Sequence, residues 1–228
     1  MQNQGTWLKR LERSLRGTFG QRIDTPMARL GSLVHYNLFD HAFLRMVWTN
    51  QYEIAPHIYR SNQPVDWRLR RLKRQGVRTI ITLRGAESHA HHLFEEETCT
   101  RLGLGFYTVK LAARSAPHVD QIERLLHLFR TVETPFLFHC KSGADRAGLA
   151  AVLYLHVIKG EPISAARRML SWKYYHLSST KTGILDAFVE AFRTAQAHSG
   201  VDFETWLRTQ YDRDALSHAF AHRKRGAA

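Results

Sequence analysis

One of the two cysteines of the chain, Cys140, stands where a nucleophile can act. It follows the apolar run 135–139 (PFLFH), and Arg146 comes six residues later, at the start of a helix-forming stretch. A cysteine thiolate is a strong nucleophile, and a guanidinium binds two oxygens of a phosphate group at once. The spacing therefore predicts a site where Cys140 attacks phosphorus while Arg146 binds the phosphate oxygens.

The residues between this cysteine and this arginine are suited to surround an anion with backbone N–H groups. Ser142, Gly143 and Ala144 are small, and Gly143 can adopt a positive φ without penalty. The helix that follows adds unpaired N–H groups and the positive end of its dipole. We expect an anion-binding loop whose field also stabilises the Cys140 thiolate, with backbone hydrogen bonds of His139 fixing its start.

The surrounding pattern predicts the elements that position this loop. Short apolar runs alternate with helix-like stretches, which favours an α/β fold with a compact, mainly parallel central sheet flanked by helices. The expected strands are 78–84, 105–111 and 135–139, and the expected helices are 88–103, 117–133 and most of the chain after 147. Ligands bind at the carboxyl ends of strands in such sheets, and Cys140 falls there.

Composition narrows the possible functions. The chain has 228 residues, of which 44% are hydrophobic and 23% charged, and this suits one soluble domain. Its net charge of +13 favours anionic partners such as phosphorylated substrates or an acidic membrane face. No aromatic and basic motif of a nucleic-acid module is present, so we expect no nucleic-acid partner. Two cysteines and a polar beginning of the chain favour a cytoplasmic protein.

We divide the chain into a basic, helical N-terminal segment (1–53), a catalytic domain (54–196) and a C-terminal helical extension (197–228). In the first segment, Leu8, Leu11, Leu15 and Phe19 share one helical face, next to Trp7, and basic residues lie between them. Such a helix either docks on the catalytic domain or lies in an anionic membrane interface.

The stretch HCKSGADRAG (139–148) resembles the signature loop, His-Cys-x5-Arg, of cysteine-dependent protein tyrosine phosphatases. The chain is most similar to the compact dual-specificity branch and to its bacterial members, over roughly 54–192. IYRSNQP (58–64) and TIITLRG (79–85) resemble the start of that catalytic domain. The resemblance implies a dual-specificity-phosphatase-like fold, Cys140 as nucleophile, Arg146 as phosphate-binding residue and a cradle formed by residues 141–145.

The chain departs from that family pattern at two points. The family usually has Ser or Thr after the arginine, and its hydroxyl helps the thiolate leave; this chain has Ala147. The loop 111–117, where the family commonly places an acidic residue, contains no carboxylate. We predict Asp145 as the general acid, with Asp120 as the alternative. Asp145 could instead brace the cradle, and Asp120 could instead favour the start of a helix. The reaction could also use no protein acid.

Substrate recognition is expected to involve the cradle and nearby basic residues. Arg84, Arg114 and Lys141 are placed to recognise a second phosphate or an acidic head group, unless they are surface charge. The full set of expected substrate-binding residues is His139, Lys141, Ser142, Gly143, Ala144, Arg84 and Arg114.

The predicted function is hydrolysis of phosphate monoesters through a phosphocysteine intermediate. We expect a monomer with no cofactor and no metal, acting on a phosphorylated protein or lipid, with peripheral contact to an anionic membrane at its inner face. The alternative is a non-catalytic module that uses the same loop to bind phosphate or another anion.

Overall fold

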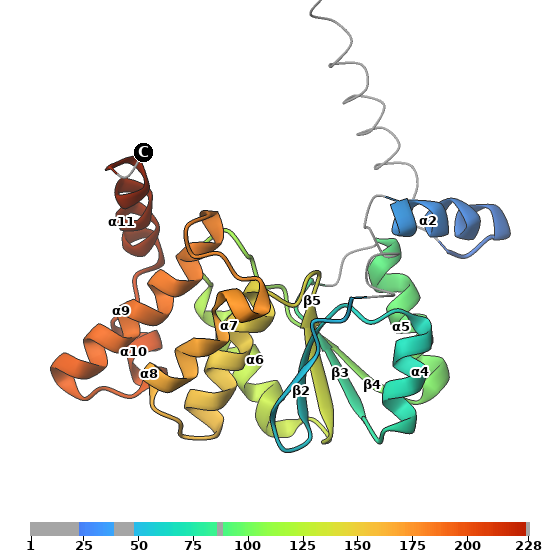
Figure 1. The fold of residues 1–228 in the computed structure, drawn as a ribbon, viewed down its shortest axis with the longest axis horizontal. Helices are drawn as coiled ribbons and strands as arrows, with labels where there is room; N and C mark the ends of the chain where they lie inside the picture. The colour runs from blue at the N-terminus through green and yellow to red at the C-terminus, as the bar shows by residue number, and fades with distance from the viewer. Residues whose placement is uncertain (1–22, 39–47, 86–88, 227–228) are drawn as a thin grey trace, which may run out of the picture.

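A single sheet forms the centre of the protein (Figure 1). The computed structural model describes residues 23–38, 48–85 and 89–226. Within these residues the strands are β1 (Tyr52–Ala55), β2 (Ile58–Asn62), β3 (Thr79–Thr82), β4 (Gly105–Thr108) and β5 (Phe136–Cys140). They lie in the order β1-β2-β5-β3-β4, and only the β1–β2 pair is antiparallel. The predicted α/β fold with a mainly parallel sheet is therefore confirmed.

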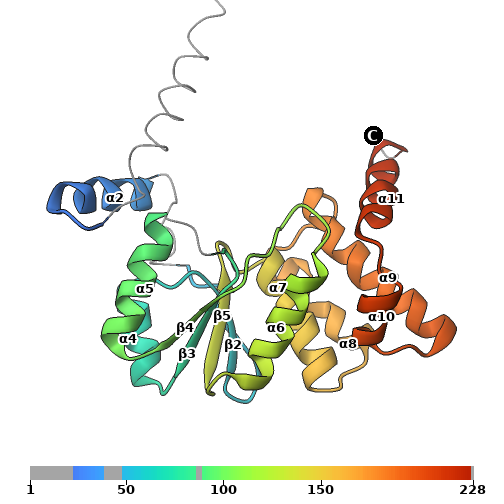
Figure 2. The same cartoon turned by 180° about the vertical axis from the view of Figure 1, so that it is seen from behind.

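Helices cover both faces of the sheet (Figures 1 and 2). One face carries α4 (Asp66–Arg74) and α5 (Ala90–Leu102), and the other carries α6 (Val119–Thr131), α7 (Asp145–Leu153), α8 (Ile163–Ala166) and α9 (Ile184–Ser199). Helix α2 (Pro26–Leu38) contacts α5, while α10 (Phe203–Thr209) and α11 (Arg213–Gly226) follow α9. Short helical turns complete the chain: η1 (Tyr154–Ile158), η2 (Arg167–Met169), η3 (Trp172–Tyr174) and η4 (Lys181–Gly183).

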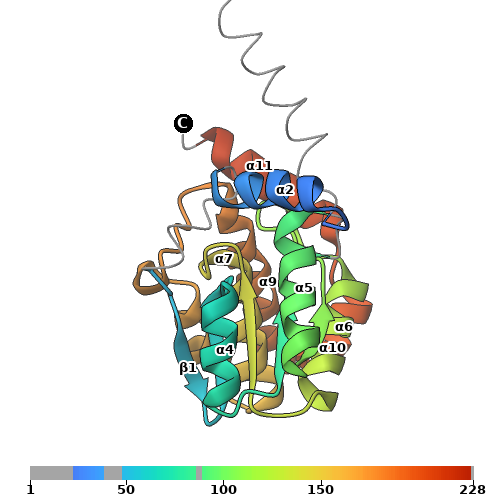
Figure 3. The same cartoon turned by 90° about the vertical axis from the view of Figure 1, so that its right-hand side faces the viewer.

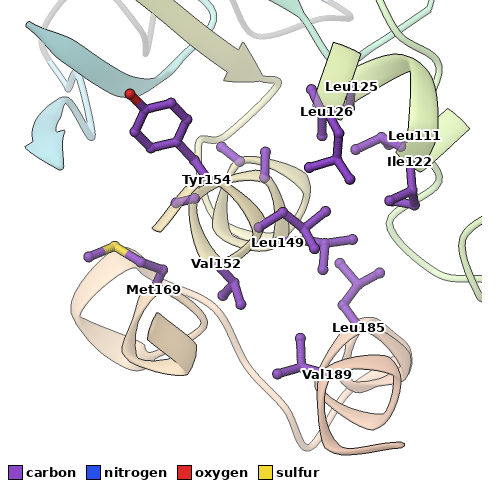
Figure 4. Packing of buried hydrophobic residues seen from close by; sticks show 14 of the residues in the cluster. Leu111, Ile122, Leu125, Leu126, Leu149, Val152, Tyr154, Met169, Leu185 and Val189 are labelled. Atoms are coloured by element: carbon purple, nitrogen blue, oxygen red, sulfur yellow. The ribbon is translucent and has the colours of Figure 1, made fainter. Parts of the chain in front are cut away.

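The central strand β5 is buried on both faces, which explains its apolar sequence. Phe136, Phe138 and Cys140 join the large hydrophobic cluster formed with α6, α7 and α9, part of which appears in Figure 4. Leu137 points to the opposite face and joins the smaller cluster under α4 and α5. This alternation, inherent to a strand, places the Cys140 side chain on the α7 side and that of His139 on the α5 side.

The proposed domain boundaries do not coincide with breaks in the structure. Residue 54 lies inside β1 and residue 197 lies inside α9. Phe203, Trp206 and Leu207, in the predicted C-terminal extension, are buried in the same large cluster as the sheet. The predicted C-terminal extension is thus packed against α9, where the ring of Trp206 contacts those of Phe188 and Phe192.

The N-terminal segment is described only in part. The helix predicted around Trp7, Leu8, Leu11, Leu15 and Phe19 lies outside the described residues. Across the described ranges, no helix combines the length and the apolar character that crossing a membrane requires.

Candidate active site

The predicted anion-binding loop lies at the carboxyl edge of the sheet, between the end of β5 and the start of α7 (Figure 3). Gly143 has a φ of +76°, as the sequence predicts. A β-carbon on Gly143 would lie 2.6 Å from the backbone nitrogen of Asn62 and 2.8 Å from the carbonyl carbon of Ser61. Glycine is required at position 143 for two reasons: its positive φ, and the close approach of the loop to β2.

Side chains outside the loop bind its carbonyl groups. Asn50 Nδ2 donates to the carbonyl oxygen of Ser142 at 2.9 Å. Arg60 Nη2 donates to those of Gly143, at 2.7 Å, and Ala144, at 3.2 Å. In a trans peptide the C=O and the next N–H point in opposite directions, so carbonyls turned outward leave N–H groups turned inward. The loop can therefore form an anion cradle.

Arg60 is the support that the sequence analysis missed. It is fully buried in β2, donates to the carbonyl oxygen of Met169 at 2.8 Å, and its guanidinium carbon lies 4.1 Å from the ring centre of Tyr174. Burial lowers the pKa of Arg60 to about 10, against the raising effect of nearby anionic groups, the first of which is Cys140. The guanidinium remains charged at neutral pH and adds positive potential below the cradle. The sequence feature that could have identified Arg60 is its position as a charged residue within a short strand.

A second buried chain of contacts supports the start of the loop. His139 Nδ1 lies 3.4 Å from the carbonyl oxygen of Cys140, and its Nε2 lies 2.8 Å from Glu95 Oε1, although this second contact lacks hydrogen-bond geometry. Glu95 Oε2 accepts a hydrogen bond from Gln63 Nε2 at 2.7 Å. The side-chain oxygen of Gln63 accepts in turn from Arg84. Arg84, expected to recognise substrate, is thus engaged in supporting the loop.

Arg146 has a guanidinium that is available for a phosphate. Its Nη1 makes a long, 3.5 Å contact with the carbonyl oxygen of Leu83, and its Nε is buried without a hydrogen-bond partner among the described residues. Cys140, 1% exposed, lies at the base of the same loop. The structure therefore places Cys140 and Arg146, which the sequence predicts as nucleophile and phosphate-binding residue, at the two ends of one loop.

The two candidate acids have different surroundings. Asp145 begins α7, and its Oδ1 lies 2.7 Å from Nδ1 of the buried His176. His176 Nε2 contacts Asp186 of α9 at 2.6 Å. Asp120 is exposed in the first turn of α6. The geometry favours the bracing alternative for Asp145, because its carboxylate is held by a histidine.

The remaining predicted residues differ in their exposure. Lys141 is partly buried, and its carbonyl oxygen accepts from the Gln63 backbone N–H at 3.4 Å. Arg114 is exposed in the connection between β4 and α6. Ala147, which replaces the usual hydroxyl residue, is fully buried. The sequence had not identified Glu95, Gln63 or His176 as parts of the site.

An aromatic turn follows α8 beside the cradle. Tyr174 and His176 point inward, where they contact Arg60 and Asp145, while Trp172, Tyr175 and Leu177 point outward. Tyr175 has a φ of +63°, and its ring packs edge-on against Trp48 at a centroid distance of 4.9 Å. The exposed side chains, with Trp172 at 69% exposure, form an apolar surface on a turn that is fastened to the loop.

The second cysteine has surroundings unlike those of a reactive thiol. Cys99 is buried in α5 within the small hydrophobic cluster. Burial, assisted by Glu95 and Glu96, raises the pKa of its thiol. Both cysteines are free, and only Cys140 belongs to the loop.

Comparisons with known proteins agree with this arrangement. Residues 46–183 match the family described as DSP-PTPase phosphatase fused to NAD+ Kinase. Over 122 residues the chain is 30% identical to the dual specificity protein phosphatase TpbA of Pseudomonas aeruginosa strains UCBPP-PA14 and PAO1. This match covers 51% of the chain and 51% of TpbA, so the chain spans about half the length of these relatives.

Solved structures share the fold. The crystal structure of P. aeruginosa TpbA matches with a TM-score of 0.50 and 21% identity, over 76% of this chain and 91% of that one. A putative phosphatase from Shewanella putrefaciens CN-32 matches with a TM-score of 0.51 and 20% identity, over 65% of this chain and 96% of that one.

Proposed function

Because the chain belongs to the family of DSP-PTPase phosphatases fused to NAD+ kinase, and the matched region contains the whole loop, we propose that it hydrolyses phosphate monoesters. The observation that carries the proposal is the placement of Cys140 and Arg146 at the two ends of a loop whose carbonyls are bound from outside by Asn50 and Arg60. TpbA is named a dual specificity protein phosphatase, and a related activity is proposed for this chain.

The reaction proceeds in two displacements. In the first, the Cys140 thiolate attacks phosphorus, an S–P bond forms and the P–O bond to the leaving group breaks. In the second, water attacks phosphorus, the S–P bond breaks, and inorganic phosphate and the thiolate are released. Inward N–H groups and Arg146 stabilise the charge on the equatorial oxygens in both steps. No hydroxyl at Ala147 assists the departure of the thiolate, so we expect the second step to limit turnover.

Protonation of the leaving group is the step with the least protein support. Asp145 is held by His176, and the loop 111–117 supplies no carboxylate. Substrates whose leaving group needs no proton should therefore react best. Asp120 remains the alternative acid, and a lower kcat/KM for phenyl phosphate, but not for para-nitrophenyl phosphate, in Asp120→Asn would support that role.

The substrate is proposed to be a phosphorylated protein or lipid, with a lipid head group preferred. The apolar side chains of the aromatic turn support this preference. Helix α2 lies at the same end of the molecule as the carboxyl edge of the sheet (Figures 1 and 3), and its Met27 is 79% exposed, with Leu30 and Val34 also exposed. Exposed apolar side chains on a chain of net charge +13 suit peripheral contact with an anionic membrane at the cytoplasmic side.

The test uses para-nitrophenyl phosphate at mildly acidic pH, followed by a panel of phosphopeptides and phosphorylated lipids. Wild type should turn over and Cys140→Ser should not, while Cys99→Ser, the matched control, should keep its activity. A protein that binds phosphate without turnover would instead be the non-catalytic module. Turnover in Cys140→Ser would exclude the phosphocysteine mechanism.

A further inference from the structure

A buried histidine joins the loop to a distant helix. His176 is 3% exposed, and its two ring nitrogens lie 2.7 Å from Asp145 Oδ1 and 2.6 Å from Asp186 Oδ2. Asp145 begins α7, and Asp186 lies in the first turn of α9. One imidazole ring therefore connects the amino-terminal ends of two helices.

The contacts require a charged ring. An imidazole donates from both nitrogens only when it is protonated, and both partners here are carboxylates, which accept. Burial lowers the pKa of His176, but the hydrogen bonds and charges of Asp145, from α7, and Asp186, from α9, outweigh it and raise the pKa to about 9. His176 is therefore an imidazolium at neutral pH.

The turn that carries His176 is fastened to the loop at a second point. Asn50 Nδ2 donates both to the carbonyl oxygen of Ser142, in the loop, and to that of Tyr174, in the turn, at 3.2 Å. The Tyr174 ring lies against the guanidinium of Arg60, which itself binds the loop. His176 is thus presented to Asp145 by a turn whose position relative to the cradle is already fixed.

We propose that His176 is a positioning residue of the phosphatase reaction, which holds Asp145 as a brace at the end of the cradle and keeps it from acting as general acid. The proposal rests on the proposed function. With His176 in place, the Asp145 carboxylate is held by a cation. Without it, that carboxylate is free to reorient next to a phosphate dianion, which it repels.

The principal test compares His176→Gln with His156→Gln. His156 is the control, since it is a partly buried histidine of η1 whose Nδ1 contacts the carbonyl oxygen of Glu161 and no residue of the loop. We expect His176→Gln to lower kcat/KM by on the order of tenfold to 100-fold, because displacement of a binding group by a fraction of an ångström has effects of that size. The loss should be equal for para-nitrophenyl phosphate and phenyl phosphate, and His156→Gln should show none.

A pH profile separates positioning from a merely structural role. The activity of wild type should fall as the pH rises through about 9, where His176 loses its proton. His176→Gln has no such proton to lose, so its activity, plotted relative to its own maximum, should not show this decline. If His176→Gln keeps the wild-type kcat/KM, the proposal is wrong. If it slows phenyl phosphate selectively, or Asp145→Asn does, Asp145 is the acid and the proposal is wrong as well.

Two further measurements keep the test independent of folding and of turnover. If His176→Gln does not fold, Asp186→Asn serves in its place, because it removes one of the two anchors of the ring and should lower kcat/KM in the same way for both substrates. Binding of inorganic phosphate by calorimetry, in a Cys140→Ser background, should weaken by about tenfold on adding His176→Gln. An unchanged affinity would overturn the positioning role, whereas an inactive wild type would overturn only the proposed function.

Discussion

Replacing Arg60 with methionine tests whether a buried cation under the loop sets the geometry of the cradle. Methionine is flexible and unbranched like the arginine stem, but it is shorter and has no donors. Three carbonyl oxygens, those of Met169, Gly143 and Ala144, would lose the hydrogen bonds that Arg60 gives them. The carbonyls of the loop would then be free to turn inward, and the N–H groups to turn away from the phosphate.

The size of the effect follows from two opposing contributions. Hydrogen bonds to a charged donor contribute about 1.5–3 kcal/mol each, so three of them contribute roughly 4.5–9 kcal/mol. Burial lowers the pKa of Arg60 from its ordinary value to about 10, which corresponds to a cost of about 3 kcal/mol for keeping the cation buried. The variant is relieved of that cost, so the free energy of unfolding should fall by about 1.5–6 kcal/mol.

Arg68→Met is the matched control for this experiment. Arg68 is also buried, and it donates to Asn62 Oδ1, Gln51 Oε1 and Ser61 Oγ rather than to the loop carbonyls. Urea unfolding of both variants gives the loss of stability, and kcat/KM is then measured where both are fully folded. We expect Arg60→Met to lose on the order of 100-fold in kcat/KM and Arg68→Met far less. Equal kcat/KM for the two folded variants would refute the idea that Arg60 orients the cradle.

Three further predictions follow from the same contacts. Gly143→Ala should lower the free energy of unfolding by at least about 1–2 kcal/mol, from its left-handed backbone alone, and abolish most activity, as unfolding and kinetic measurements would show. Arg146→Lys should lose on the order of 100-fold in kcat/KM, since an ammonium cannot bind two phosphate oxygens in one plane; wild-type kinetics would contradict this. His176 has a folded-state pKa of about 9, above its ordinary 6.5. Its protonation therefore contributes about 3 kcal/mol to the free energy of unfolding below pH 6.5, and this contribution is lost as the pH rises through 9. The stability difference between wild type and His176→Gln should shrink over that interval, and a constant difference would show that the ring is not charged.

The sequence alone was sufficient to predict the loop between β5 and α7 and the mainly parallel sheet that carries it. An apolar strand ending at Cys140, small residues, a glycine with positive φ and Arg146 at a helix start are all local features. Local backbone rules act over a few residues, so the order of residues determines the loop and the strand before it. The alternation of apolar runs and helices predicts the parallel sheet in the same way.

The support of the loop was decided by the tertiary structure. Arg60 lies 83 positions before the loop carbonyl that it binds, and His176 lies 31 positions after Asp145. In the sequence Arg60 is one basic residue among 33, and Asp145 is a carboxylate that suits either an acid or a brace. A buried polar group must find a partner wherever packing places one, and no local pattern encodes which partner that is. Folding therefore determines that Arg60 binds the loop carbonyls, that Arg84 binds Gln63, and that Asp145 is held by a histidine.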